Sequence, residues 1–261
     1  MRNIDFGRIL FGLGIAGLGV LSLVFGKFAL QWQPVPDGLP EWLSYANGGI
    51  MLAGGVGLLL VRRVAVVSSL TLLVYLALWV AIQAINDIAH PLDVGANLGL
   101  FEDLALMCGA WIAYATLADD GIAFLKGPRA LMMARILFGV ACLVFGLSHF
   151  LYADFTAQMV PVFLPFHLPL AYITGAGHVA AGLALISGVL SRLAATCEAA
   201  MMSLFLVLVH IPMVLTPIPT GMAQLFWTML CIAGALSGSA WLLASSLNDR
   251  SWGLAHQRSL G

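Results

Sequence analysis

Eight apolar stretches recur along the chain, separated by short polar or glycine- and proline-containing segments. Each stretch holds about 20 mainly apolar residues, enough for a helix with a rise of about 1.5 Å per residue to cross the hydrocarbon core of a bilayer. Helices are favoured because backbone N–H and C=O groups in lipid must be hydrogen-bonded within the segment. The pattern therefore predicts an all-α integral membrane protein with eight transmembrane helices. The predicted spans are Ile9–Leu30, Trp42–Val61, Val64–Ile85, Leu98–Leu117, Leu131–Leu151, Leu168–Leu190, Ala194–Leu215 and Met222–Ser245.

The composition supports this class and excludes others. Hydrophobic residues make up 61% of the chain and charged residues only 9%, whereas soluble domains are about 25% charged. A net charge of -1 with no basic run excludes a nucleic-acid-binding role. Because the spans consume most of the chain, no soluble catalytic domain fits between them. Any chemistry must take place within the bundle, at its surface or on a partner chain.

The distribution of basic residues predicts the orientation. In the eight-span arrangement, every Lys and Arg except Lys27 falls on one side of the membrane. Short cytoplasmic loops are enriched in these residues, so both termini are expected in the cytoplasm, at a bacterial inner membrane. The outer side is acidic, and its aromatic residues, including Trp32, Trp42, Phe163 and Phe166, are expected to anchor the interface.

The two halves of the chain resemble each other. The segment Arg8-Ile-Leu-Phe-Gly12 returns as Arg135-Ile-Leu-Phe-Gly139, and at the same offset of 127 residues Pro34-Val35 matches Pro161-Val162. Because each copy holds an even number of spans, the two four-helix repeats are expected to be parallel, unlike the inverted repeats of many transporters. The predicted division is a first repeat at 1–117, a cytoplasmic linker at 118–130, a second repeat at 131–246 and a cytoplasmic tail at 247–261.

Three histidines in the second half are the main candidates for chemistry, because polar side chains inside a bilayer are costly. His149, His178 and His210 all fall in the outer half of their predicted spans. Three imidazoles could ligate a metal, two could hold a haem iron, or one could hydrogen-bond a quinone oxygen and pass its proton. Their separations form no short metal motif. The alternative is that each histidine is an ordinary polar contact between helices.

The first half lacks this set, since Ser22 and Met51 align with His149 and His178. It offers instead Asn47 within its second span and the adjacent carboxylates Glu102 and Asp103 at the mouth of its fourth. Such a pair is expected to be solvated at the interface; if buried, it could relay protons. No charge is expected deep within the spans, which, with the parallel repeats, disfavours a transporter.

Several segments of the second half resemble the DoxX family: Arg135–Gly139, Gly146-Leu-Ser-His149, Val160–Pro165, Tyr172–Gly182 and Arg192-Leu-Ala-Ala. Well-known members include a membrane subunit of a quinone-linked thiosulfate oxidoreductase and a membrane organiser of superoxide and thiol defence. The resemblance implies the fold, the membrane location and a link to quinones or redox chemistry. Many relatives have a glutamate where this chain has His178, which argues against a carboxylate-based role at that position.

These observations predict an accessory membrane subunit of a respiratory or redox system, with no activity of its own. It would bind a quinone or a similar lipophilic molecule in an outer-half pocket, with haem as the second choice of cofactor and no bound metal. Its partners would be the lipid bilayer and a redox protein, with a non-catalytic scaffold that docks other proteins as the alternative. The candidate ligand-binding residues are His149, His178, His210, Asn47, Glu102 and Asp103.

Overall fold

The computed structural model describes residues 4–29, 33, 39–86, 93–249 and 252, and every regular element in these ranges is a helix. Trp32 and most of the predicted tail at 247–261 lie outside the described residues. The first half contains α1 (Ile4–Phe25), α2 (Trp42–Leu59), α3 (Arg62–Asn86) and α4 (Val94–Leu117), followed by the short 3-10 helix η2 (Ala123–Leu125). The second half contains α5 (Gly127–Leu151), α6 (Ala153–Met159), α7 (His167–Ser187), α8 (Ser191–Phe205), the π-helix η3 (Leu206–His210), α9 (Ile211–Leu215) and α10 (Ala223–Ser246).

Seven helical segments in the described ranges are long and apolar enough to cross a membrane, one fewer than the sequence predicts. Six of them are single helices, and the seventh joins α8, η3 and α9. The exception is α2, which has 18 residues and includes Asn47 and five glycines. Glycine and asparagine contribute little hydropathy, so α2 falls short even though it packs as its neighbours do. The first span is also displaced toward the N-terminus, because Gly26 adopts a left-handed conformation directly after α1 and ends the helix.

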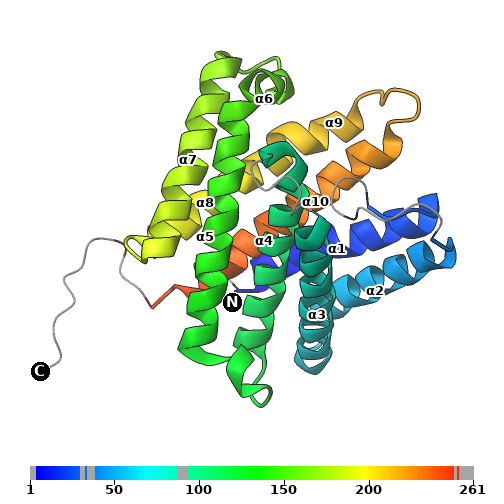
Figure 1. The fold of residues 1–261 in the computed structure, drawn as a ribbon, viewed down its shortest axis with the longest axis vertical. Coiled ribbons are helices and arrows are strands. Elements are labelled where there is room, and N and C mark those ends of the chain that lie inside the picture. The colour runs from blue at the N-terminus through cyan, green and yellow to red at the C-terminus, as the bar shows by residue number, and fades with distance from the viewer. Residues whose placement is uncertain (1–3, 30–32, 34–38, 87–92, 250–251, 253–261) are drawn as a thin grey trace, which may run out of the picture.

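Most of the long helices pack against a neighbour along the chain, whereas α10 packs against α1, α4 and α8. α1 packs against α2 and α10, and α5 packs against α7 and α4. α4 and α10 contact each other at the centre, where most of their residues are buried. Figure 1 shows α4, α5 and α7 along the length of the molecule, with α1 and α2 crossing them at a slant. The two halves therefore meet along α1 with α10, along α4 with α5 and along α4 with α10.

Close glycine crossings join the first two long helices of each half. A Cβ atom on Gly55 would lie 2.6 Å from the carbonyl oxygen of Gly12, so α1 and α2 touch through their backbones. A Cβ atom on Gly182 would lie 2.7 Å from the carbonyl oxygen of Gly139, which joins α5 and α7 in the same way. Both residues of the second pair stand 127 residues after those of the first. Small residues allow such close approach between helices in lipid.

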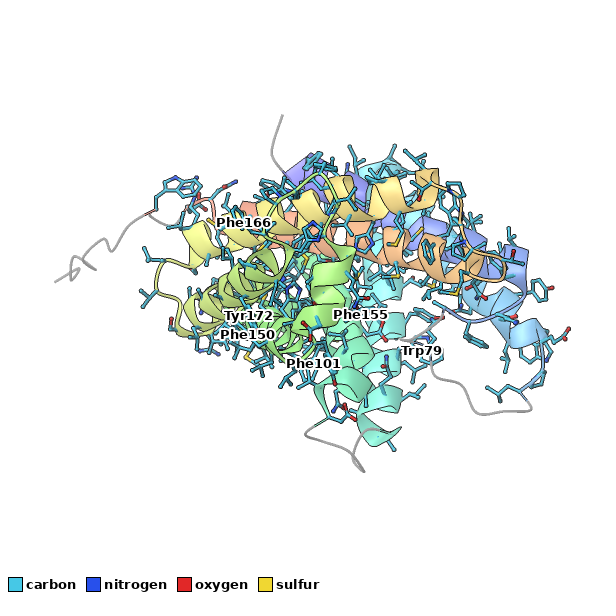
Figure 2. All side chains as sticks on the ribbon, turned by 90° about the horizontal axis from the view of Figure 1, so that it is seen from above. Trp79, Phe101, Phe150, Phe155, Phe166 and Tyr172 are labelled. Carbon is cyan, nitrogen blue, oxygen red and sulfur yellow. The ribbon has the colours of Figure 1, made fainter. Side chains whose placement is uncertain are left out.

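Exposed aromatic side chains surround the end of the second half where α6 lies. Phe150, Phe155, Phe166 and Tyr172 are all exposed, and the rings of Phe150 and Tyr172 stack with their centroids 6.0 Å apart. Figure 2 views the molecule from this end and shows these four residues around α5, α6 and the start of α7. This is the placement typical of aromatic residues that anchor a membrane protein at the interface.

Candidate functional site

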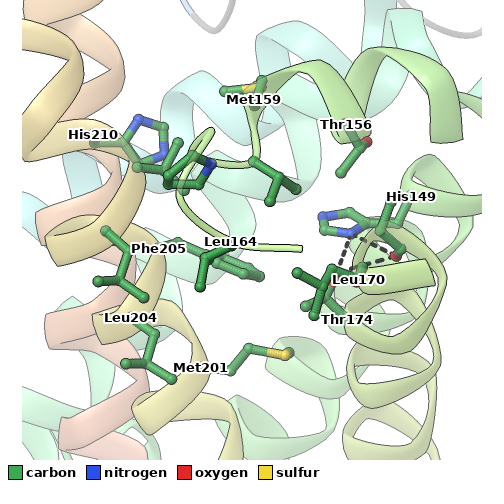
Figure 3. Close-up of a pocket in the computed structure, with 15 residues that line it drawn as sticks. His149, Thr156, Met159, Leu164, Leu170, Thr174, Met201, Leu204, Phe205 and His210 are labelled. Carbon is green, nitrogen blue, oxygen red and sulfur yellow. Dashed lines mark hydrogen bonds between the residues drawn. The ribbon is translucent and has the colours of Figure 1, made fainter. Parts of the chain in front are cut away.

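A cavity of about 270 Å³ opens among α5, α6, α7, α8 and the π-helix η3, at the end of the bundle opposite the 118–126 connection. Most of its lining is aliphatic or aromatic. Its side-chain hydrogen-bonding groups are His149, Thr156, Thr174 and His210. Figure 3 shows His149 and Thr174 on one wall, with His210, Phe205 and Leu204 opposite. An apolar cavity with a few converging polar groups is the usual form of a small-molecule site.

The His149 ring is held in one tautomer. Its Nδ1 atom lies 2.9 Å from the Thr174 hydroxyl and 3.4 Å from the carbonyl oxygen of Ala171. The Thr174 hydroxyl has two backbone acceptors of its own, the carbonyl oxygens of Leu170 at 2.8 Å and Ala171 at 3.0 Å. Because the Ala171 carbonyl can only accept and the Thr174 hydroxyl has backbone acceptors of its own, these contacts favour the tautomer that carries the ring proton on Nδ1. This leaves a lone pair on Nε2, which makes no hydrogen bond within the described part of the chain.

His210 reaches the cavity through an irregular helix. The amide N–H of Ile211 bonds to the carbonyl oxygen of Leu206, five residues earlier, which defines a π-helical turn. Pro212 follows and has no N–H with which to continue an α-helical ladder. The Nδ1 atom of His210 is buried and has no hydrogen-bond partner among the described residues. π-helical turns of this kind recur at functional sites.

His178 lies one layer behind the cavity and does not line it. Its ring centroid is 5.1 Å from that of His149, and the Phe205 ring lies 5.9 Å from His149 and 5.8 Å from His178. The Nδ1 atom of His178 lies 2.8 Å from Oε1 of Glu198 on α8. His178 and Glu198 are each 1% exposed, so the pair is closed off from solvent. The structure thus brings the three predicted histidines to one region in two layers.

Glu198 corrects the expectation that no charge lies deep in the spans. It is an acidic residue within the predicted span Ala194–Leu215, and this placement alone marks it as costly in lipid. Its Oε2 atom is buried without a hydrogen-bond partner among the described residues. The sequence could have indicated Glu198, but only the packing of α7 against α8 pairs it with His178.

Asn47 belongs to a separate polar network in the first half. Its side-chain amide donates to the Ser22 hydroxyl at 2.9 Å, and its carbonyl oxygen accepts from Gln33 at 2.9 Å and from the Tyr75 hydroxyl. Gln33 also donates to the Tyr75 hydroxyl at 3.0 Å. The structure therefore places Asn47 in a closed hydrogen-bonded cluster rather than at the cavity.

Glu102 and Asp103 lie on α4, outside the cavity lining. Asp103 is fully buried and accepts a hydrogen bond from Gln83 on α3, while Glu102 is only partly buried. The expectation of a solvated interface pair is wrong for Asp103, because α3 packs over the face of α4 that carries it. No group of three His, Cys, Asp or Glu side chains in the described ranges is arranged to hold a metal ion.

The segment that resembles known proteins contains the whole cavity lining. Residues 130–211 match the family model described as DoxX. Every residue that lines the cavity, from His149 to His210, lies within this segment. No characterised protein and no solved structure gives a significant match to the chain.

Proposed function

We propose that this multi-pass membrane protein, which carries a DoxX domain at residues 130–211, binds a quinone or a similar lipophilic ring compound in the cavity beside His149. The carrying observation is an apolar cavity in a membrane-spanning bundle with His149 on one wall and His210 on the opposite wall. Two facing nitrogen groups suit a flat ring that carries oxygen atoms on opposite edges. The aliphatic lining suits the rest of a lipophilic molecule.

The first half supports this choice of ligand chemistry. At the offset of 127 residues, Gln33 is equivalent to Val160, which lines the cavity, and Asn47 is equivalent to Thr174. In the first half, the Gln33 side-chain amide occupies the position equivalent to Val160 and hydrogen-bonds to Asn47 and Tyr75. The second half has an apolar valine at that position and an open cavity. A ligand with a polar head and an apolar body would complete it.

The proposed biological role is that of an accessory subunit in a respiratory or redox system of the bacterial inner membrane. A quinone exchanges both protons and electrons. His149 and His210 can exchange protons, whereas the described residues offer no metal cluster as an electron donor. The electrons would therefore come from a partner chain.

The test is to purify the protein in mild detergent from a host that makes its own quinone, to extract it with organic solvent and to analyse the extract by mass spectrometry. We expect about one molecule per chain, counted as the sum of the quinone and its reduced hydroquinone, and a loss of about tenfold or more in the His149→Ala variant. His167→Ala is the matched control, because His167 begins α7 but does not line the cavity.

Two outcomes would contradict the proposal. A Soret band in the visible spectrum would identify haem in place of quinone. If the wild-type extract contains neither quinone nor haem, the histidines are structural, and a scaffold that docks partner proteins becomes the better explanation.

A further inference from the structure

The His178–Glu198 pair has no evident structural benefit. Both residues are almost completely buried in membrane-spanning segments. Among the described residues, the Glu198 carboxyl contacts His178 at 2.8 Å and the weakly polar Cys142 thiol, and its Oε2 atom has no hydrogen-bond partner. Removing two ionisable groups from water costs more than a single bond returns, and well-packed apolar residues usually stabilise such a place as well or better. Ionisable groups kept inside a membrane usually serve a function.

Among the groups that surround the His178–Glu198 pair, the one that adjoins the cavity and can exchange a proton is His149. On α5, the titratable groups near it are His149, at the cavity wall, and the Cys142 thiol, which interacts with Glu198. From α10, the polar side chains that bond to α8 are Ser237 and Trp241, which do not titrate in this range. Within the described residues, His149 is therefore the only group that both contacts the cavity and can exchange a proton near the Glu198 charge.

The His149 tautomer decides which ligand fits. When the Nδ1–H group donates hydrogen bonds to Thr174 and Ala171, neutral His149 presents only the Nε2 lone pair to the cavity. An oxidised quinone offers only carbonyl oxygens, which are acceptors and cannot bond to a lone pair. A hydroquinone offers an O–H donor. Neutral His149 thus discriminates between the two forms of the same ring.

We propose that the cavity selects the reduced, hydroxyl-bearing form of the ligand, a hydroquinone, and that Glu198, acting through His178, supports proton transfer from that hydroxyl to His149. This inference rests on the proposed quinone site. In the step, the O–H bond of the hydroquinone breaks and an N–H bond forms at Nε2, with both electrons of the O–H bond left on oxygen. The products are a hydroquinone anion and a doubly protonated His149. Glu198 is a positioning residue, since its negative charge balances the imidazolium without touching the ligand.

The experiment measures the affinity of decylubiquinol and decylubiquinone under anaerobic conditions, from pH about 4 to about 8.5, a range that extends to the acid side of the titration of a free histidine. For the wild-type protein at the alkaline end, we expect the quinol to bind about tenfold or more tightly than the quinone. Equal affinity for the two forms would overturn the selection while leaving the quinone site intact. Binding of neither form would refute the quinone site itself.

The role of Glu198 is tested by its pH profile. Glu198→Gln keeps an acceptor for His178 but removes the charge, so the midpoint of the pH dependence of affinity should move by about one pH unit toward acid. Glu102→Gln removes a carboxyl group outside the cavity and should leave the midpoint unchanged. If Glu198→Gln has the same profile as the wild type, Glu198 has no part in the transfer.

A second variant keeps the inference testable if Glu198→Gln does not fold. Thr174→Val preserves shape but removes one of the two acceptors that fix the His149 tautomer. We expect the preference for quinol over quinone to fall about threefold or more, since one hydrogen bond is worth about that factor or more. An unchanged preference would show that the tautomer is not what selects the ligand.

Discussion

At the scale of single residues, each half of the chain places polar side chains at matching positions and uses them differently. Ser22 and Asn47 stand where the second half has His149 and Thr174. In the first half these groups are bonded to each other and to Gln33, so the cluster is complete. In the second half, the Nε2 atom of His149 has no partner in the described ranges and adjoins a cavity. The same geometry therefore yields a structural cluster in one half and a candidate site in the other.

Gln33 is the residue on which the first cluster depends. It lies outside the helices, is 3% exposed, and also accepts a hydrogen bond from the Ala29 amide at 2.9 Å. We expect Gln33→Ala to lower the free energy of unfolding by about 1–3 kcal/mol, because it leaves buried partners unsatisfied. Thermal unfolding in detergent measures this. Gln224→Ala, which removes a single longer bond to the Phe28 carbonyl, should have a smaller effect; equal losses would show that the cluster contributes little.

At the scale of elements, the glycine crossings fix how the first two long helices of each half approach each other. The Gly12–Gly55 and Gly139–Gly182 contacts leave no space for a methyl group on either side. In lipid there is little hydrophobic force between helices, so close packing of this kind carries much of the association energy. The Gly12–Gly55 contact also holds α2 beside α1, although α2 is not among the seven segments that meet the length and apolarity of a span.

The crossing can be tested with two glycines of the same helix. A Cβ atom on Gly55 would meet the Ala16 amide nitrogen at 2.4 Å, whereas one on Gly49 would meet nothing within 4 Å. Gly55→Ala should therefore destabilise the protein by about 1–3 kcal/mol through overpacking. Gly49→Ala should be neutral or slightly stabilising, since alanine favours helix. The measurement is the melting temperature of each variant in detergent. If Gly55→Ala melts at the wild-type temperature, the close contact between α1 and α2 at Gly55 is wrong.

At the scale of the whole molecule, the topology depends on whether α2 crosses the bilayer. Seven segments in the described ranges meet the length and apolarity of a span, and α2 is not among them. An odd number of crossings would place the termini on opposite sides, whereas an even number places them together. With eight crossings, every Lys and Arg except Lys27 faces one side. Without the α2 crossing, only Arg2 and Arg8 would face the other side, so the asymmetry favours eight crossings by a small margin.

We expect epitope tags at both termini to be protected from protease in intact spheroplasts. A tag inserted beside Phe163, in the exposed connection between α6 and α7, should be cleaved and serves as the control. Cleavage of the N-terminal tag with protection of the C-terminal tag would show that α2 does not span the membrane. The eight-span topology would then be wrong.

The sequence by itself determined the class of the molecule and most of its helices. Long apolar stretches specify membrane helices because lipid leaves unpaired backbone groups no alternative partner. The repeated Arg-Ile-Leu-Phe-Gly segments similarly indicated matching halves, and the spacing of Gly139 and Gly182 is that of Gly12 and Gly55. The hydropathy pattern predicted α2 less clearly than the other helices, because Asn47 and all its glycines except Gly49 are buried against neighbouring helices.

Only the tertiary structure decided which polar groups meet. Glu198 and His178 are 20 residues apart on different helices, and no sequence period brings them to 2.8 Å. Asn47 and Asp103 were candidates from the sequence beside the histidines, but neighbouring helices cover them, whereas His149 and His210 adjoin a cavity. The reason is that a hydropathy pattern records what one segment prefers. Pairing and open space depend on the side chains that several segments bring to the same place.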